Sequence, residues 1–306
     1  MRKKLLVTGL SGFVGQHLQR VLGGARPALD WQLLQPEGSY DLLDSAALNR
    51  MLEQHQPDAV IHLAGQTFVP EAFRDPAHTL QVNLLGTLNL LQALKRRGFS
   101  GTFLYVSSGD VYGQVAETDL PVVETLAPQP RNPYAVSKVS AELLCRQWSY
   151  TEPWRIIVAR PFNHIGAGQG ESFVIANMAK QIVRVRQGLQ PPRLEVGDID
   201  VTRDFLDVQD VIEAYLLLLE KGRNGEVYNV CSGQERRVRD LISEMAELAG
   251  VEVELLQDPA RMRRSEQRRV VGSSEKLQKE TGWTPGVNIT ETLCRVLSDW
   301  EERERQ

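Results

Sequence analysis

The chain has 306 residues, 24% of them charged and 42% hydrophobic, which is typical of a globular protein with a large core. Its net charge of −4 gives no general attraction to nucleic acid or to an acidic membrane. No apolar run approaches the ~20 residues that span a bilayer, and Cys145, Cys231 and Cys294 are far apart and in no metal-ligand spacing. We therefore expect a cytoplasmic protein with reduced thiols, no metal and no nucleic-acid or membrane partner.

A glycine-rich turn follows the first expected strand, Lys4–Thr8. It reads Gly9-Leu-Ser-Gly12-Phe-Val-Gly15 and leads into an amphipathic helix that ends near Leu22. Strand, glycine turn and helix in this order are typical of dinucleotide binding, because the turn brings backbone and a helix N-terminus close to a pyrophosphate. The G-x-x-G-x-x-G spacing alone fits a purely structural turn equally well.

The expected second strand, near 31–34, does not indicate which dinucleotide binds. An acidic residue at its end would bind a ribose 2′-hydroxyl, whereas an arginine would favour a 2′-phosphate. The segment instead ends in Gln35-Pro36-Glu37, and the sequence leaves NADH and NADPH open. Asp41, a little further on, could accept a hydrogen bond from an adenine amino group or could be an ordinary loop carboxylate.

Further buried strands are expected at 58–65, 101–106, 155–159 and 226–230, and helices separate them, including 83–97 and 134–148. Nearer the C-terminus we expect a helix at 238–249 and a short strand at 251–255. This alternation predicts an α/β fold with a Rossmann-like, doubly wound parallel sheet. We expect residues 1–165 to form a dinucleotide-binding domain with a return segment near 204–232. Residues 166–306 should form mainly a smaller α/β lobe that binds substrate.

The stretch 107–138 carries groups suited to proton transfer. Ser107 and Ser108 follow a buried strand, and Tyr134 and Lys138 lie four residues apart in an expected helix, hence on one face. An ammonium near a phenol favours the phenolate, so we expect Lys138 to lower the pKa of Tyr134. With Ser108 holding the oxygen, the three groups could move a proton at a C–OH/C=O centre.

Arginines concentrate at 261–269, which includes Arg263 and Glu266. Such a run is either an exposed, solvated loop or a set of planar donors that clamps a diphosphate together with Arg203.

The motifs in series resemble one enzyme family. They are Thr8-Gly-x-x-Gly-x-x-Gly15, His62-Leu-Ala-Gly, Asn83-x-x-Gly-Thr, Ser-x-x-x-Val-Tyr-Gly113, Tyr134-x-x-x-Lys138 and Arg160-Pro-x-Asn163. In this order they are similar to the extended short-chain dehydrogenase/reductases that act on nucleotide sugars. Within that family, the segments 160–166, 203–208, 227–233 and 263–266 look like those of the GDP-4-keto-6-deoxy-D-mannose reductases, which make GDP-D-rhamnose.

The resemblance implies a role for each matching residue. It implies that NADPH or NADH is held by Gly9, Gly12, Phe13, Val14, Gly15, Asp41, Leu42, Leu63, Ala64, Gly65, Tyr134 and Lys138. It implies that Ser108, Tyr134 and Lys138 are catalytic, and that a GDP-sugar contacts Ser107, Ser108, Tyr134, Asn163, Arg203, Arg263 and Glu266. It also implies a homodimer formed through a helix bundle of segments 83–97 and 134–148.

Three other functions stay open. The related 4,6-dehydratases carry a glutamate base where this chain has Asp110, and some place an acid where it has Gly109. A dehydratase needs that base close to its proton, so the shorter Asp110 and the glycine favour the reductase. A nucleotide-sugar epimerase and a non-catalytic NAD(P)-binding regulatory protein are the remaining alternatives.

Overall fold

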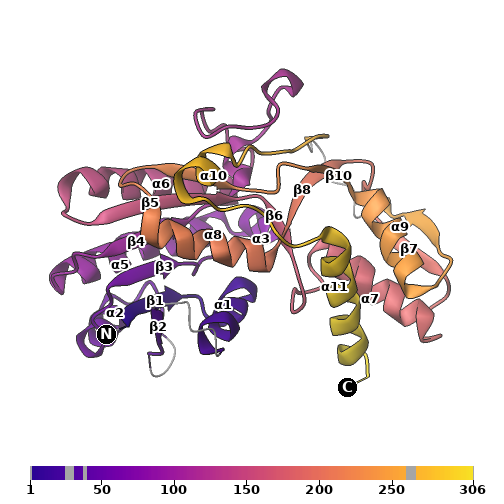
Figure 1. The fold of residues 1–306 in the computed structure, drawn as a ribbon, viewed down its shortest axis with the longest axis horizontal. Coiled ribbons are helices and arrows are strands. Elements are labelled where there is room, and N and C mark those ends of the chain that lie inside the picture. The colour runs from indigo at the N-terminus through magenta and orange to yellow at the C-terminus, as the bar shows by residue number, and fades with distance from the viewer. Residues whose placement is uncertain (1, 25–30, 37–39, 260–266, 306) are drawn as a thin grey trace.

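The computed structural model describes residues 2–24, 31–36, 40–259 and 267–305. Its main sheet has six parallel strands in the order β2-β1-β3-β4-β5-β9, which confirms the predicted parallel α/β fold (Figure 1). The strands are β1 (Lys3–Thr8), β2 (Trp31–Leu34), β3 (Ala59–His62), β4 (Thr102–Val106), β5 (Arg155–Pro161) and β9 (Val227–Val230).

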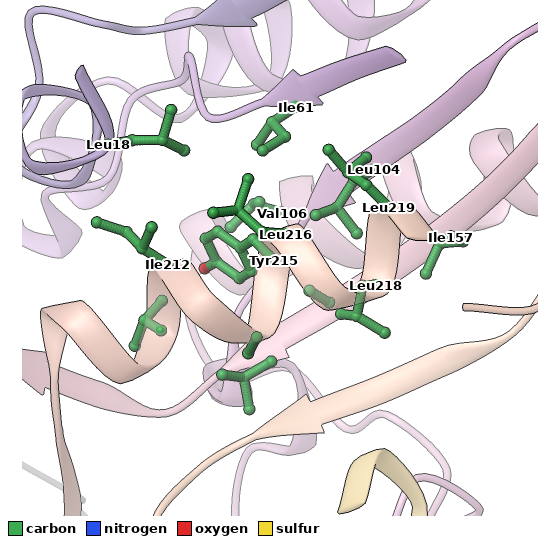
Figure 2. Close-up of a cluster of buried hydrophobic side chains, with 14 of the residues drawn as sticks. Leu18, Ile61, Leu104, Val106, Ile157, Ile212, Tyr215, Leu216, Leu218 and Leu219 are labelled. Atoms are coloured by element: carbon green, nitrogen blue, oxygen red, sulfur yellow. The ribbon is translucent and has the colours of Figure 1, made fainter. Parts of the chain in front are cut away.

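Helices cover both faces of this sheet, because successive strand residues point to opposite sides and both sides are apolar. Leu5 and Val7 pack with α1 (Phe13–Gly23), α8 (Val208–Lys221) and α10 (Glu275–Thr281) on one face. Leu6 packs with α2 (Ser45–Gln54), α5 (Gly86–Arg96) and α6 (Pro133–Thr151) on the other. Figure 2 shows α8 bringing Ile212, Tyr215 and Leu219 to the same cluster as Ile61, Leu104 and Val106 of the sheet.

A second core lies beyond the carboxyl end of the sheet. It is built on α7 (Val174–Arg186), α9 (Val238–Ala249), α11 (Ile289–Arg303) and the parallel pair β7 (Arg193–Val196) and β11 (Glu254–Gln257). Between the two cores lies a three-stranded sheet of β10 (Glu235–Arg237), β8 (Thr202–Asp207) and β6 (Asn163–Ile165) (Figure 1). The chain thus passes from the main sheet into the second core directly after β5.

Several elements differ from the sequence-based expectation. The strand expected at 251–255 lies at 254–257. The single helix expected from residue 83 begins as a π-helical turn, η1 (Gln81–Leu85), preceded by the unpredicted short helices α3 (Val69–Arg74) and α4 (Pro76–Leu80). The strand at 227–230 joins the main sheet as expected. The proposed domain boundary stays a prediction, with α10 packing on the main sheet.

Among the described helices, none has both the length and the apolar character needed to cross a membrane.

Candidate active site

The glycine turn lies where the strand order reverses, since β1 is flanked by β2 on one side and β3 on the other. Ligands of open α/β sheets bind at such a point, beyond the carboxyl ends of the strands. Gly9 has a φ of 79°, which favours glycine, and a Cβ there would lie 2.8 Å from the Ala64 nitrogen. A Cβ on Gly15 would lie 2.3 Å from the Gly9 carbonyl oxygen, so α1 packs on the turn only without a side chain here.

The N-terminus of α1 suits a pyrophosphate. Its N-cap, Gly12, offers no side-chain cap, and the first turn carries no acidic residue, so backbone N–H groups remain for an anion. A Cβ on exposed Gly12 would meet only the Gly9 carbonyl oxygen, at 3.3 Å. Phe13 and Val14 follow as half-buried residues, and the Phe13 ring stacks on His164 with centroids 6.1 Å apart. These residues fit a dinucleotide cofactor.

The loop after β3, Leu63-Ala64-Gly65, is half-buried and faces the glycine turn. Thr8 fixes it, because its Oγ1 accepts from the Ala64 N–H at 3.2 Å and lies 2.7 Å from His62 Nδ1. The other ring nitrogen of His62 lies 3.0 Å from Thr87 Oγ1, and burial lowers the pKa of His62 to about 3. His62 is therefore a neutral structural link.

Asp41 and Leu42, which the resemblance implies at the adenine, differ in their exposure to solvent. Asp41 is exposed, and its Oδ1 accepts from the Leu43 N–H at 2.9 Å. The Leu42 side chain is buried against Gly86, so only its backbone can face a ligand. Residues 37–39, including Glu37, lie outside the described residues.

Tyr134 and Lys138 lie on the first turns of α6, which Asn132 caps by accepting from the Ala135 N–H at 2.7 Å. Both side chains are buried, with 8% and 3% exposed. The Tyr134 hydroxyl is hydrogen-bonded to Ser108, and Lys138 Nζ donates to the Val106 carbonyl oxygen at 2.8 Å. The structure thus brings Ser108, Tyr134 and Lys138 together at the carboxyl end of β4.

The predicted lowering of the Tyr134 pKa is wrong for this structure. Burial raises the pKa of Tyr134, the charge of Asp110 raises it further, and the hydrogen bond to Ser108 lowers it. Burial also lowers the pKa of Lys138 to about 8, against the opposing charge of Glu142. The phenol is consequently protonated at neutral pH, which is the state that a proton donor requires.

Asn83 connects the cofactor loop to the catalytic helix. Its side-chain Nδ2 donates to the Gln66 carbonyl oxygen and to Ser137 Oγ, both at 2.8 Å, while its Oδ1 accepts from the Gln66 N–H at 2.8 Å. From the sequence, Asn83 was recognisable only as part of the Asn83-x-x-Gly-Thr motif. The signal that could have revealed its role is a buried amide in an otherwise apolar helical pattern.

The residues expected to bind substrate lie on the β4 end and the three-stranded sheet. Ser107 is buried, with no hydrogen-bond partner for its Oγ within the described part of the chain. Exposed Asn163 stands opposite Phe205 of β8, and Arg203 lies two residues before Phe205, hence on the same face. Arg203 Nη1 donates to the carbonyl oxygens of Thr202 and Gln267. Arg263 and Glu266 lie outside the described residues.

The Phe162 ring lies close to position 109. A Cβ there would lie 3.2 Å from the Phe162 ring, so an acidic side chain would have to displace that ring. Asp110 is exposed in the 3₁₀ turn η2 (Gly109–Tyr112), where its N–H donates to Ser108 Oγ at 3.2 Å. The structure therefore gives a physical reason for the glycine at this point.

A sequence model of the GDP-mannose 4,6 dehydratase family matches residues 38–296. The chain belongs to this family. Among its relatives, GDP-6-deoxy-D-mannose reductase of Pseudomonas aeruginosa is 65% identical over 306 residues, the whole length of both chains. GDP-6-deoxy-D-talose 4-dehydrogenase of Aggregatibacter actinomycetemcomitans is 30% identical over 91% of each chain.

Solved structures agree with this membership of the GDP-mannose 4,6 dehydratase family. The structure of RMD from Pseudomonas aeruginosa complexed with NADPH matches with a TM-score of 0.94 and 64% identity, over 98% of this chain and 99% of that one. UDP-glucose 4-epimerase of Thermus thermophilus in complex with NAD matches with a TM-score of 0.84 and 31% identity, over 97% and 98%. The shared fold thus extends over nearly the entire chain.

Proposed function

We propose that this chain is an NADPH-dependent reductase that converts the C4 keto group of GDP-4-keto-6-deoxy-D-mannose to the alcohol, giving GDP-D-rhamnose. The observation that carries the proposal is the full-length 65% identity to a GDP-6-deoxy-D-mannose reductase. The site supports it independently, because a protonated phenol, a serine hydroxyl and a buried ammonium lie beside a dinucleotide cradle.

When bound, NADPH supplies a hydride to the C4 carbonyl carbon. Tyr134 donates its phenolic proton to the C4 oxygen as negative charge develops there. Ser108, already hydrogen-bonded to Tyr134, holds the same oxygen and stabilises that charge. Lys138 lies with its Nζ 5.9 Å from the centre of the Tyr134 ring, where its positive charge favours the phenolate left by proton transfer.

The remaining predicted residues would position cofactor and substrate. The glycine turn 9–15 and the N-terminus of α1 would hold the pyrophosphate, and the loop at 63–65 would line the cofactor. Ser107, Asn163 and Arg203 would contact the GDP-sugar from the β4 end and from one face of the β6–β8 pair. The family resemblance adds Arg263 and Glu266 to this set.

Gly109 favours reduction over 4,6-dehydration. A dehydratase must also remove a sugar C5 proton and expel the 6-hydroxyl, which requires a further acid–base group beside the catalytic hydroxyl. Phe162 lies against Gly109, so an acidic side chain there would require the ring to shift. Asp110, one residue further on, is exposed in η2 and is one methylene shorter than the glutamate of the dehydratases, although its charge reaches Tyr134 and raises the pKa of that phenol.

Incubation of the purified protein with each substrate separates the two reactions. A reductase oxidises NADPH in the presence of GDP-4-keto-6-deoxy-D-mannose and leaves GDP-D-mannose unchanged with NADP⁺. A dehydratase converts GDP-D-mannose to the keto sugar with no net consumption of cofactor. Turnover of GDP-D-mannose alone would replace the proposal, and turnover of neither sugar with intact NADPH binding would favour a regulatory protein.

We also propose that the protein acts in the cytoplasm as a homodimer that pairs α6 and α5 with their symmetry mates. The three cysteines are free thiols, as in most cytosolic proteins. Val136, Leu143 and Tyr150 of α6 are exposed by 41%, 62% and 71% and lie seven residues apart, so they form one apolar stripe. Leu143→Glu should give a monomer in sedimentation analysis; an unchanged mass would remove α6 from the interface.

A further inference from the structure

Two arginines stand directly opposite each other in the three-stranded sheet. The antiparallel register of β8 and β10 pairs Arg203 with Arg236, so their side chains leave the same face. The hydrogen bond between the side chains of Thr202 and Glu235 lies on the opposite face, in keeping with this alternation. Like charges placed directly opposite each other oppose folding, so such a pair calls for an explanation.

Arg236 has a buried guanidinium nitrogen without a partner among the described residues. Its Nη2 donates to Gln234 Oε1 at 2.6 Å, but its Nε is buried and has no hydrogen-bond partner among the described residues. Three guanidinium groups nearby meet carboxylates: Arg239 pairs with Asp200, Arg268 with Asp198, and Arg269 with Glu235 and Glu117. A buried N–H donor without a partner costs free energy that a bound acceptor would recover.

The same face also carries Asn163, which the proposed function assigns to the GDP-sugar. Asn163 pairs with Phe205, which lies two residues along β8 from Arg203, and Phe162 beside it packs on Gly109 next to catalytic Ser108. With strands ~4.8 Å apart and a rise of ~3.3 Å per residue, Asn163 and Arg236 lie roughly 12 Å apart along this face. This is about the reach from a sugar ring to the diphosphate attached to it.

We propose that Arg236 is a further binding residue, whose guanidinium donates to the diphosphate of the GDP-sugar beside Arg203. The inference rests on the proposed function for the identity of the ligand. A dianion between the two guanidinium groups neutralises their repulsion and provides the acceptor that the buried Nε lacks. Arg236 thereby contributes affinity for the nucleotide and has no part in the proton transfer.

Calorimetric titration of the full-length protein with GDP and with guanosine tests the assignment. Arg236→Gln should raise the Kd for GDP about tenfold and leave the Kd for guanosine within about twofold, because only GDP carries the diphosphate. Arg236→Lys retains the positive charge without the planar guanidinium and should lose less affinity for GDP than Arg236→Gln. Arg237→Gln is the matched control, since Arg237 is the exposed neighbour on the opposite face of β10.

Thermal unfolding provides a readout that does not depend on the ligand. Removing one of two facing charges should leave the ligand-free Arg236→Gln variant at least as stable as the wild type. Equal GDP affinities of the Arg236→Gln and Arg237→Gln variants would overturn the proposal, as would equal losses for GDP and guanosine in Arg236→Gln. A wild type that binds GDP but does not reduce the keto sugar would overturn the proposed function and leave this comparison valid.

Discussion

Arg160, at the end of β5, holds the carboxylate of Glu142 on α6 through two hydrogen bonds, from Nε at 2.9 Å and from Nη2 at 2.6 Å. Both side chains are buried. Glu142 lies one helical turn after Lys138, and its charge raises the pKa of that lysine against the lowering caused by burial. The ion pair therefore fixes a negative charge close to the catalytic ammonium.

Replacing Glu142 by Gln should move the alkaline limb of the pH profile of kcat/KM. In the wild type, Lys138 loses its proton as the pH rises through its pKa of about 8, so the rate should fall above that pH. Without the Glu142 charge the fall should begin at lower pH. The groups that face Lys138 are His62 on β3, Tyr105 on β4, and Tyr134, Glu142 and Cys145 on its own helix.

The control for this variant is Glu152→Gln, which removes a half-buried ion pair with Lys95 at the far end of the same helix. Since Glu142→Gln leaves Arg160 buried without its partner, it should also destabilise the protein by about 3–5 kcal/mol. The folded fraction is therefore isolated by gel filtration before the kinetics. An alkaline limb that stays in place would show that Glu142 does not influence Lys138.

Lys138→Met should abolish most turnover yet stabilise the protein at pH 7. The pKa of Lys138 is lowered from 10.5 to about 8 on folding, so the unfolded chain binds more protons between these values and wild-type stability rises with pH across that window. Below pH 8 folding carries the full free-energy cost of burying the charged Lys138. A pKa lowering of this size corresponds to roughly 3 kcal/mol, which the hydrogen bond to Val106 partly offsets. Urea unfolding at pH 7 and 9.5 checks whether Lys138→Met is more stable at pH 7 and whether its stability no longer rises with pH. A less stable variant that keeps the wild-type pH dependence would refute this view of the burial cost.

Tyr134→Phe should reduce turnover by about 10²–10⁴-fold, the usual contribution of a positioned acid or base. The ring remains to fill its buried site, so the affinity for NADPH and the thermal midpoint should change little. Tyr150→Phe, which removes an exposed hydroxyl from the same helix, is the matched control. Steady-state kinetics measure the loss of turnover. A Tyr134→Phe enzyme within about tenfold of the wild-type rate would exclude Tyr134 as the proton donor.

Three glycines of the cofactor turn and of helix α1 should respond differently to alanine. Gly15→Ala should unfold or severely destabilise the protein, because the new Cβ would lie 2.3 Å from the Gly9 carbonyl oxygen. Gly12→Ala should fold but bind NADPH about tenfold or more weakly, since its Cβ would point to the space for the pyrophosphate. Gly23→Ala, at the far end of α1 and with no atom of the described residues within 4 Å of the new Cβ, should change neither property. Fluorescence titration and thermal unfolding measure both effects, and equal NADPH affinity in all three would refute the assigned cradle.

Long periodic elements could be predicted from the sequence, and short paired ones could not. The helix at 238–249 was expected with the bounds it has, because its apolar period is regular and Gly250, at a φ of 68°, ends it. Strands β6 and β10 have only three residues, and they exist because β8 lies between them. Such pairing is decided by tertiary contacts that leave no local pattern.

The catalytic group was predictable from spacing, but its electrostatics were not. Tyr134 and Lys138 share a helix face by their four-residue separation, and the parallel sheet brings Ser108 to the same edge. The raised pKa of Tyr134 follows from burial, which the sequence does not reveal. Arg236 escaped notice for a similar reason, since only the register of β8 and β10 places it opposite Arg203.

Transfer of a labelled hydride tests the central claim most directly. The protein is incubated with GDP-4-keto-6-deoxy-D-mannose and NADPH carrying deuterium at the transferred position of the nicotinamide, and the sugar is examined by NMR. We predict GDP-D-rhamnose with one deuterium at C4 for each NADPH oxidised. Deuterium at another carbon, a product other than GDP-D-rhamnose, or no oxidation of NADPH would contradict the assignment as a C4 reductase.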